Sequence, residues 1–144
     1  MSERIYNIDD DIPIGIKKMT FNFPPEGVDE RFFSQFTDLK NIELINNNFL
    51  SPNTESPNDT NIAQISPSAF EQCRKLETVK IGEGFNHIGD GAFNGCVMLK
   101  EIVLPDSILE IDNSAFLGCR MLNKINLPDN ITKIGVSAFM GCYN

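Results

Sequence analysis

The strongest constraint in the sequence is a repeat with a period of 23 residues. Four cysteines follow one another at this interval: Cys73, Cys96, Cys119 and Cys142. An Ala-Phe pair stands just before each of them, as Ala69-Phe70, Ala92-Phe93, Ala115-Phe116 and Ala138-Phe139. A fixed period of about 20 to 29 residues indicates stacked structural units rather than one compact core, because each unit needs a neighbour to cover its apolar face.

Five more apolar columns keep the same interval. They are Leu76, Leu99 and Leu122; Val79, Ile102 and Ile125; Ile81, Leu104 and Leu127; Ile62, Phe85, Ile108 and Ile131; and Ile65, Ile88, Ile111 and Ile134. In outline the repeat reads L-x-x-I-x-L-P-x-x-I-x-x-I-x-x-x-A-F-x-x-C. Residues 31–44 reproduce part of this spacing, with Phe33 and Phe36 in the phenylalanine and cysteine positions. The pattern therefore predicts about five coils, of which the first is irregular.

The I-x-L part of each repeat predicts a short strand. Side chains alternate between the two faces of a strand, so Ile102 and Leu104 point inward while Glu101 and Val103 point outward. Stacked coils pair such strands into a parallel sheet. Pro105 stands where the strand ends, because proline cannot donate a ladder hydrogen bond. Each coil then needs a corner, a second extended segment at its second pair of isoleucines, and a connection back to the next strand.

The connection back to the next strand is predicted to be a short helical turn. Residues 112–119 open with Asp and Asn, which favour helix N-caps, and Gly118 limits the helix to about one turn. The same pattern divides the chain into an acidic N-terminal segment, 1–15, and a repeat domain, 16–144. Within that domain, residues 46–61 form a polar loop insertion and residues 62–144 carry the regular repeats.

Two runs, 88–105 and 111–128, resemble the BspA-type class of leucine-rich repeats, whose core is A-F-x-x-C-x-x-L-x-x-I-x-L-P. The resemblance covers residues 62–144 closely and residues 16–45 weakly. It implies an α/β repeat solenoid, which is a short leucine-rich repeat array of right-handed coils with a parallel β-sheet on the concave face. It also implies a protein-binding role, since many members of the class bind host or matrix proteins at cell surfaces, although a fold does not carry its function with it.

The cysteine column has three interpretations, which are structural thiols, a metal site and disulfides. Cysteines one coil apart form a ladder along the solenoid axis, whereas the ligands of a zinc ion converge on one point. Phe36 fills the same position in the first copy, so the position requires an apolar body rather than a sulfur ligand. We therefore expect buried free thiols that act as small hydrophobic side chains, which fits a reducing compartment.

The charge and the N-terminus argue against several classes of function. Asp and Glu number 20 against 12 Lys and Arg, and the net charge of −8 opposes binding to nucleic acid or to an anionic membrane surface. No apolar run is long enough to cross a bilayer, and the acidic start lacks the basic and apolar parts of a signal peptide. We expect no nucleic-acid partner, no membrane insertion, and a location in the cytoplasm or within an intracellular particle.

The sequence contains no recognisable catalytic or metal-binding motif. His87 is the only histidine, and its column also holds Gln64, Glu110 and Lys133, as expected of an exposed and solvated position. With one histidine, no nucleophile and base constellation can be assigned. The acidic run at 9–11 lacks the spacing of a calcium loop. We therefore expect no enzymatic activity, no cofactor and no metal site.

Candidate protein-binding residues lie in three places. The outward strand columns are Asn41, Thr78, Glu101 and Lys124, with Glu43, Lys80, Val103 and Asn126 beside them. These positions vary from coil to coil, which fits either a binding face or a merely solvated one. The insertion offers Phe49 and Leu50, and the last coil offers Phe139, Met140 and Tyr143.

The sequence thus predicts a non-enzymatic protein-protein interaction module. The alternative is a structural component of a larger assembly, such as a particle shell or surface lattice, docked through its open C-terminal coil. Solenoids need polar caps, because an open coil exposes apolar side chains and strand edges. We expect that end to be covered by a protein partner, by another copy of the chain, or by further sequence.

Overall fold

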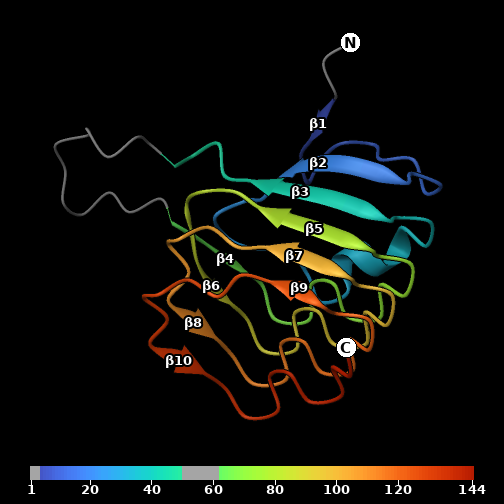
Figure 1. Ribbon diagram of the computed structural model, residues 1–144. Coiled ribbons are helices and arrows are strands. Elements are labelled where there is room, and N and C mark those ends of the chain that lie inside the picture. The colour runs from blue at the N-terminus through green and yellow to red at the C-terminus, as the bar shows by residue number, and fades with distance from the viewer. Residues whose placement is uncertain (1–3, 50–61) are drawn as a thin grey trace, which may run out of the picture.

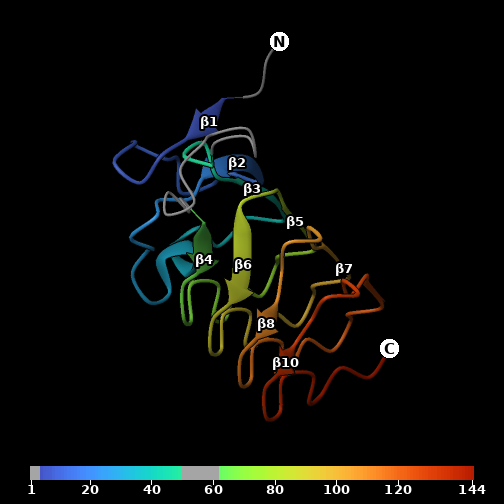
Figure 2. The same cartoon turned by 90° about the vertical axis from the view of Figure 1, so that its left-hand side faces the viewer.

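The chain forms a short solenoid with a parallel sheet on each of two sides (Figure 1). The computed structural model describes residues 4–49 and 62–144. Six strands form the larger sheet in the order β1-β2-β3-β5-β7-β9, and four form the smaller sheet in the order β10-β8-β6-β4. Figure 2 shows the smaller sheet facing the viewer, with its strands side by side.

From β5 onward the chain alternates between the two sheets, because each coil contributes one strand to each. The strands of the larger sheet are β1 (Ile5–Tyr6), β2 (Lys18–Asn22), β3 (Asn41–Ile45), β5 (Thr78–Ile81), β7 (Glu101–Val103) and β9 (Lys124–Ile125). Those of the smaller sheet are β4 (Ala63–Ile65), β6 (Phe85–Ile88), β8 (Glu110–Ile111) and β10 (Lys133–Ile134). Since β1 pairs with β2, the acidic segment 1–15 contributes a strand to the larger sheet.

The register of the larger sheet follows the repeat. Thr78 pairs with Glu101, and Glu101 pairs with Lys124, each 23 residues further along the chain. Asn41 pairs with Thr78, although the insertion lies between them. The prediction of a solenoid of about five coils with a 23-residue period is therefore confirmed.

A column of stacked phenylalanine rings runs along the axis of the solenoid. The ring centroids lie 4.1 Å apart for Phe33 and Phe70, 4.8 Å for Phe70 and Phe93, and 5.3 Å for Phe93 and Phe116. All four of these rings are completely buried. The repeated phenylalanine is therefore the residue through which each coil packs on the coil before it.

The strand residues complete the core as their alternation predicts. Ile102 is 1% exposed and Leu104 is 3% exposed, whereas Val103 between them is 39% exposed. The inward and outward assignment of these positions is therefore confirmed.

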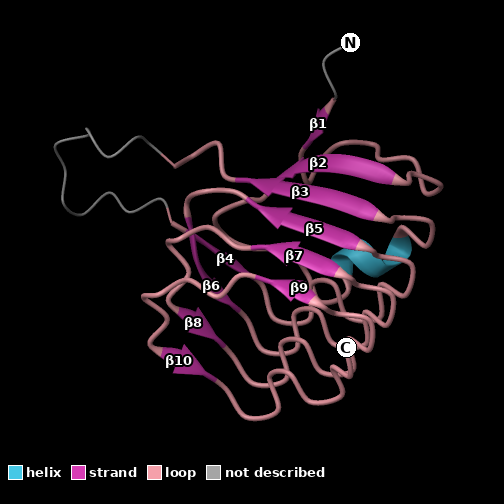
Figure 3. Cartoon of the chain, in the orientation of Figure 1, coloured by secondary structure: helices cyan, strands magenta, loops and turns pink. Residues whose placement is uncertain are grey.

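The predicted helical turns are largely absent from the described coils. Across residues 4–49 and 62–144 the one helix is the 3-10 helix η1 (Phe32–Gln35), cyan in Figure 3. Ser114 and Gly118, two residues on either side of Phe116, have positive φ angles of 55° and 73°. A left-handed residue ends a right-handed helix, so this segment forms successive turns instead. No helix in the described part of the chain is long and apolar enough to span a bilayer.

The last coil leaves apolar side chains exposed that belong to buried columns. Leu127 is 45% exposed and Ile134 is 49% exposed, whereas Leu104 and Ile111, one coil earlier, are 3% and 0% exposed. Each coil covers the one before it, so the final coil presents the side chains that a further layer would bury.

Candidate functional site

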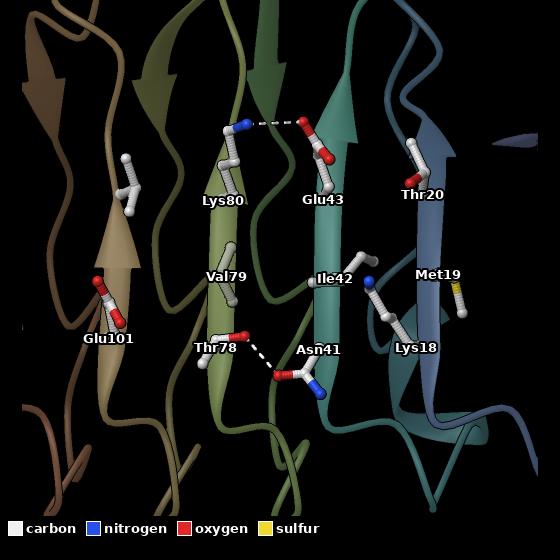
Figure 4. A pocket seen from close by; sticks show the side chains of 11 residues that line it. Lys18, Met19, Thr20, Asn41, Ile42, Glu43, Thr78, Val79, Lys80 and Glu101 are labelled. Atoms are coloured by element: carbon white, nitrogen blue, oxygen red, sulfur yellow. Dashed lines mark hydrogen bonds and ion pairs between the residues drawn. The ribbon is translucent and has the colours of Figure 1, made fainter. Parts of the chain in front are cut away.

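The outer face of the larger sheet is hollowed across β2, β3, β5 and β7 (Figure 4). The hollow has a volume of about 320 Å³ and is lined by Lys18, Met19, Thr20, Asn41, Ile42, Glu43, Thr78, Val79, Lys80, Glu101 and Val103. Outward side chains recur at every second residue of a strand, so each long strand places a pair of them around the hollow. We call the surface formed by these residues the sheet face.

Side chains on neighbouring strands pair across the sheet face. Thr78 Oγ1 donates a hydrogen bond of 2.6 Å to Asn41 Oδ1, and Lys80 Nζ lies 3.1 Å from Glu43 Oε1 (Figure 4). Both pairs follow from the register, which sets Asn41 beside Thr78 and Glu43 beside Lys80. The side chain of Lys80 is 62% exposed, so the ion pair is solvated and contributes little to stability. Its charged groups remain available to a ligand.

The sheet face also offers apolar contact at its edge. Val103 pairs with Lys80 in the register and is itself exposed. Where β1 pairs with β2, an adjoining hollow is lined by Arg4, Tyr6, Lys18, Met19 and Thr20. There the Arg4 guanidinium carbon lies 4.9 Å from the centre of the Tyr6 ring. The sheet face thus combines positive and negative charges with apolar side chains. Such a mixed surface suits a protein ligand better than it suits a ligand with a single charged group.

Six of the eight predicted strand-column residues line the hollow: Asn41, Glu43, Thr78, Lys80, Glu101 and Val103. Lys124, on the last strand of the sheet, and Asn126 do not line it. The Asn126 side chain instead forms two hydrogen bonds with the backbone of Leu104. Its Oδ1 accepts from the Leu104 N–H, and its Nδ2 donates to the Leu104 carbonyl, both at 3.3 Å.

The sequence-based prediction missed Lys18 and Met19, because the first copy of the repeat is irregular. The signal was present, since Lys18 stands 23 residues before its strand partner Asn41.

The described part of the insertion places Phe49 against the next coil. Phe49 is 37% exposed. Its side chain lies so close to the backbone of Gly84 that a Cβ added to Gly84 would lie 2.6 Å from the Phe49 Cβ. Phe49 is therefore partly packed and partly free to contact a partner. Leu50 and the rest of the insertion, 51–61, lie outside the described residues.

The three candidates in the last coil differ in exposure. The Phe139 ring lies 5.2 Å from that of Phe116, at the end of the phenylalanine column, and is partly buried. Met140 is 63% exposed and Tyr143 is 81% exposed. Met140 and Tyr143 are thus available for contact, whereas Phe139 mainly completes the core.

The four cysteines are free thiols. Cys96 Sγ donates to the Phe70 carbonyl at 3.1 Å, and Cys119 Sγ donates to the Phe93 carbonyl at 3.2 Å. Burial raises the pKa of Cys119 to about 12. A thiol that stays protonated is a poor nucleophile and a poor metal ligand. The buried thiols of Cys96 and Cys119 pack between coils as small hydrophobic groups.

Three metal-ligating side chains meet on the smaller sheet: His87, Glu110 and Asp112. One ligand atom from each lies within 4.8 Å of the others. The sequence predicts a solvated position for His87, because its column mixes polar residues of every kind. Asp112 belongs to a different column of the repeat. A comparison of the residues within one column therefore does not reveal that His87 and Asp112 lie close together in the fold.

Residues 51–144 match the family model described as BspA type leucine-rich repeat region, in six copies. Among solved structures, a leucine-rich repeat protein from Bacteroides ovatus is 22% identical with a TM-score of 0.68, and the alignment covers 96% of this chain and 35% of that protein. A leucine-rich repeat protein from T. pallidum is 24% identical with a TM-score of 0.53, covering 71% of this chain and 54% of that protein.

These comparisons confirm the fold predicted from the repeat. The chain spans 35% and 54% of the lengths of the two solved proteins, and at these identities the likeness shows the fold alone. No curated protein matches the chain significantly.

Proposed function

The chain belongs to the BspA-type leucine-rich repeat family, and from this premise we propose that it is a non-enzymatic protein-binding module that binds its partner on the sheet face. Leucine-rich repeat proteins are repeat scaffolds whose extended surfaces support protein interactions. The observation that carries the proposal is the hollow that crosses four strands of the larger sheet. The proposed contact residues are Asn41, Glu43, Thr78, Lys80, Glu101 and Val103, with Lys124 and Asn126 at the margin.

The chemistry of the sheet face indicates a polar contact of moderate strength. Lys18 and Lys80 lie among the lining residues together with Glu43 and Glu101, so a partner with both charges fits best. None of the described residues that line the hollow is aromatic. Tyr and Trp usually supply the strongest single contributions to a protein interface, so the affinity must come from many small contacts and from charge complementarity.

Two matched substitutions test this proposal. Val103 on the sheet face and Leu109 near the smaller sheet are both 39% exposed, so Val103→Arg and Leu109→Arg make the same chemical change at equal exposure on different sides. The partner is first identified by affinity purification with mass spectrometry and then titrated as a pure protein by calorimetry. We expect Val103→Arg to weaken binding at least tenfold and Leu109→Arg to leave it unchanged. Equal effects of the two variants contradict a site on the sheet face.

A third variant tests the insertion in the same titration. Deletion of residues 46–60 removes Phe49 and Leu50, and weaker binding in this variant alone would move the contact from the strands to the loop. The alternative role as a structural component rests on the exposed apolar side chains of the last coil, among them Val136 at 77% and Tyr143 at 81% exposure. Stoichiometric co-purification with an intact particle supports that role.

We also infer that the chain works in a reducing compartment, such as the cytoplasm or the interior of an intracellular particle. The free thiols support this inference, because cysteines stay unpaired where glutathione and thioredoxin keep them reduced.

A further inference from the structure

The register of the smaller sheet sets three metal-ligating side chains together. β6 and β8 are parallel, and His87 lies opposite Glu110. Residues two apart in an extended chain share a face, so Asp112 follows Glu110 on the same side. His87 Nε2 lies 2.7 Å from Asp112 Oδ2, and His87 Nδ1 lies 3.7 Å from Glu110 Oε2. The backbone of two adjacent coils therefore places the three residues close together, and their side-chain directions complete the cluster.

A fourth side chain orients the central carboxylate. Lys133 Nζ, from β10 in the next coil, donates to Asp112 Oδ1 at 3.1 Å. This contact holds the other oxygen of Asp112, Oδ2, toward His87. Groups that hold a ligand carboxylate in place in this way are a usual part of metal sites.

The cluster carries the charge that a cation needs. The cluster holds two carboxylates, those of Asp112 and Glu110, against the one ammonium group of Lys133, so these three groups together attract a dication. The side chains of His87, Glu110 and Asp112 are 21%, 41% and 25% exposed, so an ion can enter from solvent and keep bound water.

We propose that His87, Glu110 and Asp112 bind one divalent transition-metal ion, with zinc as the best fit. Zinc takes imidazole nitrogen and carboxylate oxygen at about 2.0–2.2 Å, usually with water completing a site of three protein ligands. One ligand atom from each of the three side chains already lies within 4.8 Å of the others, so the side chains must rotate closer together to hold one ion. Calcium and magnesium fit less well, because they prefer oxygen ligands alone.

A metal ion at this place links two successive coils. His87 comes from one coil, and Glu110 and Asp112 come from the next. The unfolded chain does not hold these side chains together, so an ion that binds the folded state raises its stability. The bound ion thus links two coils and stabilises the folded state, on the side of the solenoid away from the sheet face.

The single histidine makes the site directly observable. We would titrate the untagged chain with zinc chloride by calorimetry and follow the imidazole ¹⁵N signals, which come from His87 alone. We expect one zinc ion per chain, a shift of the imidazole signals, and a rise in Tm that a chelator reverses. His87→Gln, which the repeat tolerates at Gln64 in the same column, should lower the zinc affinity at least 30-fold.

A matched pair of carboxylate variants provides the control. The side chains of Glu110 and Glu43 are 41% and 39% exposed, but Glu43 lies on the sheet face. Glu110→Gln should lower the zinc affinity at least tenfold, whereas Glu43→Gln should leave it unchanged. Zinc affinity that is equal in wild type, His87→Gln and Glu110→Gln overturns the proposal. A thiolate absorption band with cobalt(II) also overturns it, because the band would place the ion on the cysteines.

Discussion

Phe93 and Phe116 stack with an interplanar angle of 0° and 5.3 Å between ring centroids, although 23 residues separate them in the sequence. The spacing is close to the distance of about 4.8 Å between neighbouring strands, so the sheet imposes it. Each ring lies between the rings of the coils before and after it, which makes the phenylalanine column a continuous contact between coils.

The position of a phenylalanine in this column determines the cost of removing it. Phe93→Ala should lower the free energy of unfolding by about 3–5 kcal/mol, because the ring is completely buried between two others. Phe139→Ala should cost clearly less, because its ring is partly buried at the end of the column. Urea unfolding followed by circular dichroism measures both, and Phe93→Leu provides a milder variant should Phe93→Ala not fold. Equal losses at the two positions would contradict this account.

Most of the fold could be predicted from the repeat, because apolar columns report burial directly. The strand of Glu101–Val103 and the inward position of Ile102 follow from alternation alone. The helical turns could not be excluded in this way. A helical turn does not form there because Ser114 adopts a positive φ of 55°. Serine rarely has a positive φ, so a serine in the sequence does not predict this conformation.

The two candidate sites also differ in how far the sequence predicts them. The sheet face follows from columns, since Asn41, Thr78 and Glu101 are register partners. The cluster at His87 does not, because its hydrogen bond to Asp112 joins different columns in adjacent coils. Contacts along a column can be read from a periodic sequence, whereas diagonal contacts depend on side-chain direction.

The thiols should differ in reactivity with their depth in the array. Iodoacetamide at pH 8 should label Cys142 first in the native protein, because Cys142 is only partly buried whereas Cys96 and Cys119 are fully buried. Peptide mass spectrometry after timed quenching gives the rates. In urea all four cysteines should react alike, which serves as the control. Native labelling of Cys119 as fast as that of Cys142 would contradict the buried column.

The same burial predicts a loss of stability at alkaline pH. The pKa of Cys119 is about 12 in the folded chain and about 8.5 in an unfolded one. The contribution of this thiol is therefore complete below about pH 8.5 and declines as the pH rises toward 12, because only the unfolded chain releases the proton. The urea midpoint of wild type should fall between pH 9 and pH 11, and that of Cys119→Ala should fall less. Parallel declines would contradict the assignment to Cys119.

Two glycines should respond differently to alanine. A Cβ on Gly89 would lie 2.6 Å from the Ile65 carbonyl oxygen, which accepts the Gly89 N–H, so Gly89→Ala should push the coils apart and cost about 2–3 kcal/mol. A Cβ on Gly118 meets nothing closer than 4.0 Å, and only its positive φ resists substitution. Gly118→Ala should therefore cost about 1 kcal/mol. Thermal unfolding compares the two variants, and a larger loss at Gly118 would contradict the close approach at Gly89.

The exposed apolar side chains of the last coil should promote association between copies of the chain. Val136 is 77% exposed near the unpaired edge of β10, and Ile14 near the other end is 69% exposed. Burial of apolar area drives association, so the weight-average sedimentation coefficient of wild type should rise with concentration. Val136→Lys should reduce this rise without changing stability, whereas Ile14→Lys should leave it as in wild type. A wild-type chain that stays monomeric across the concentration range, or two variants that behave alike, would contradict association through the last coil.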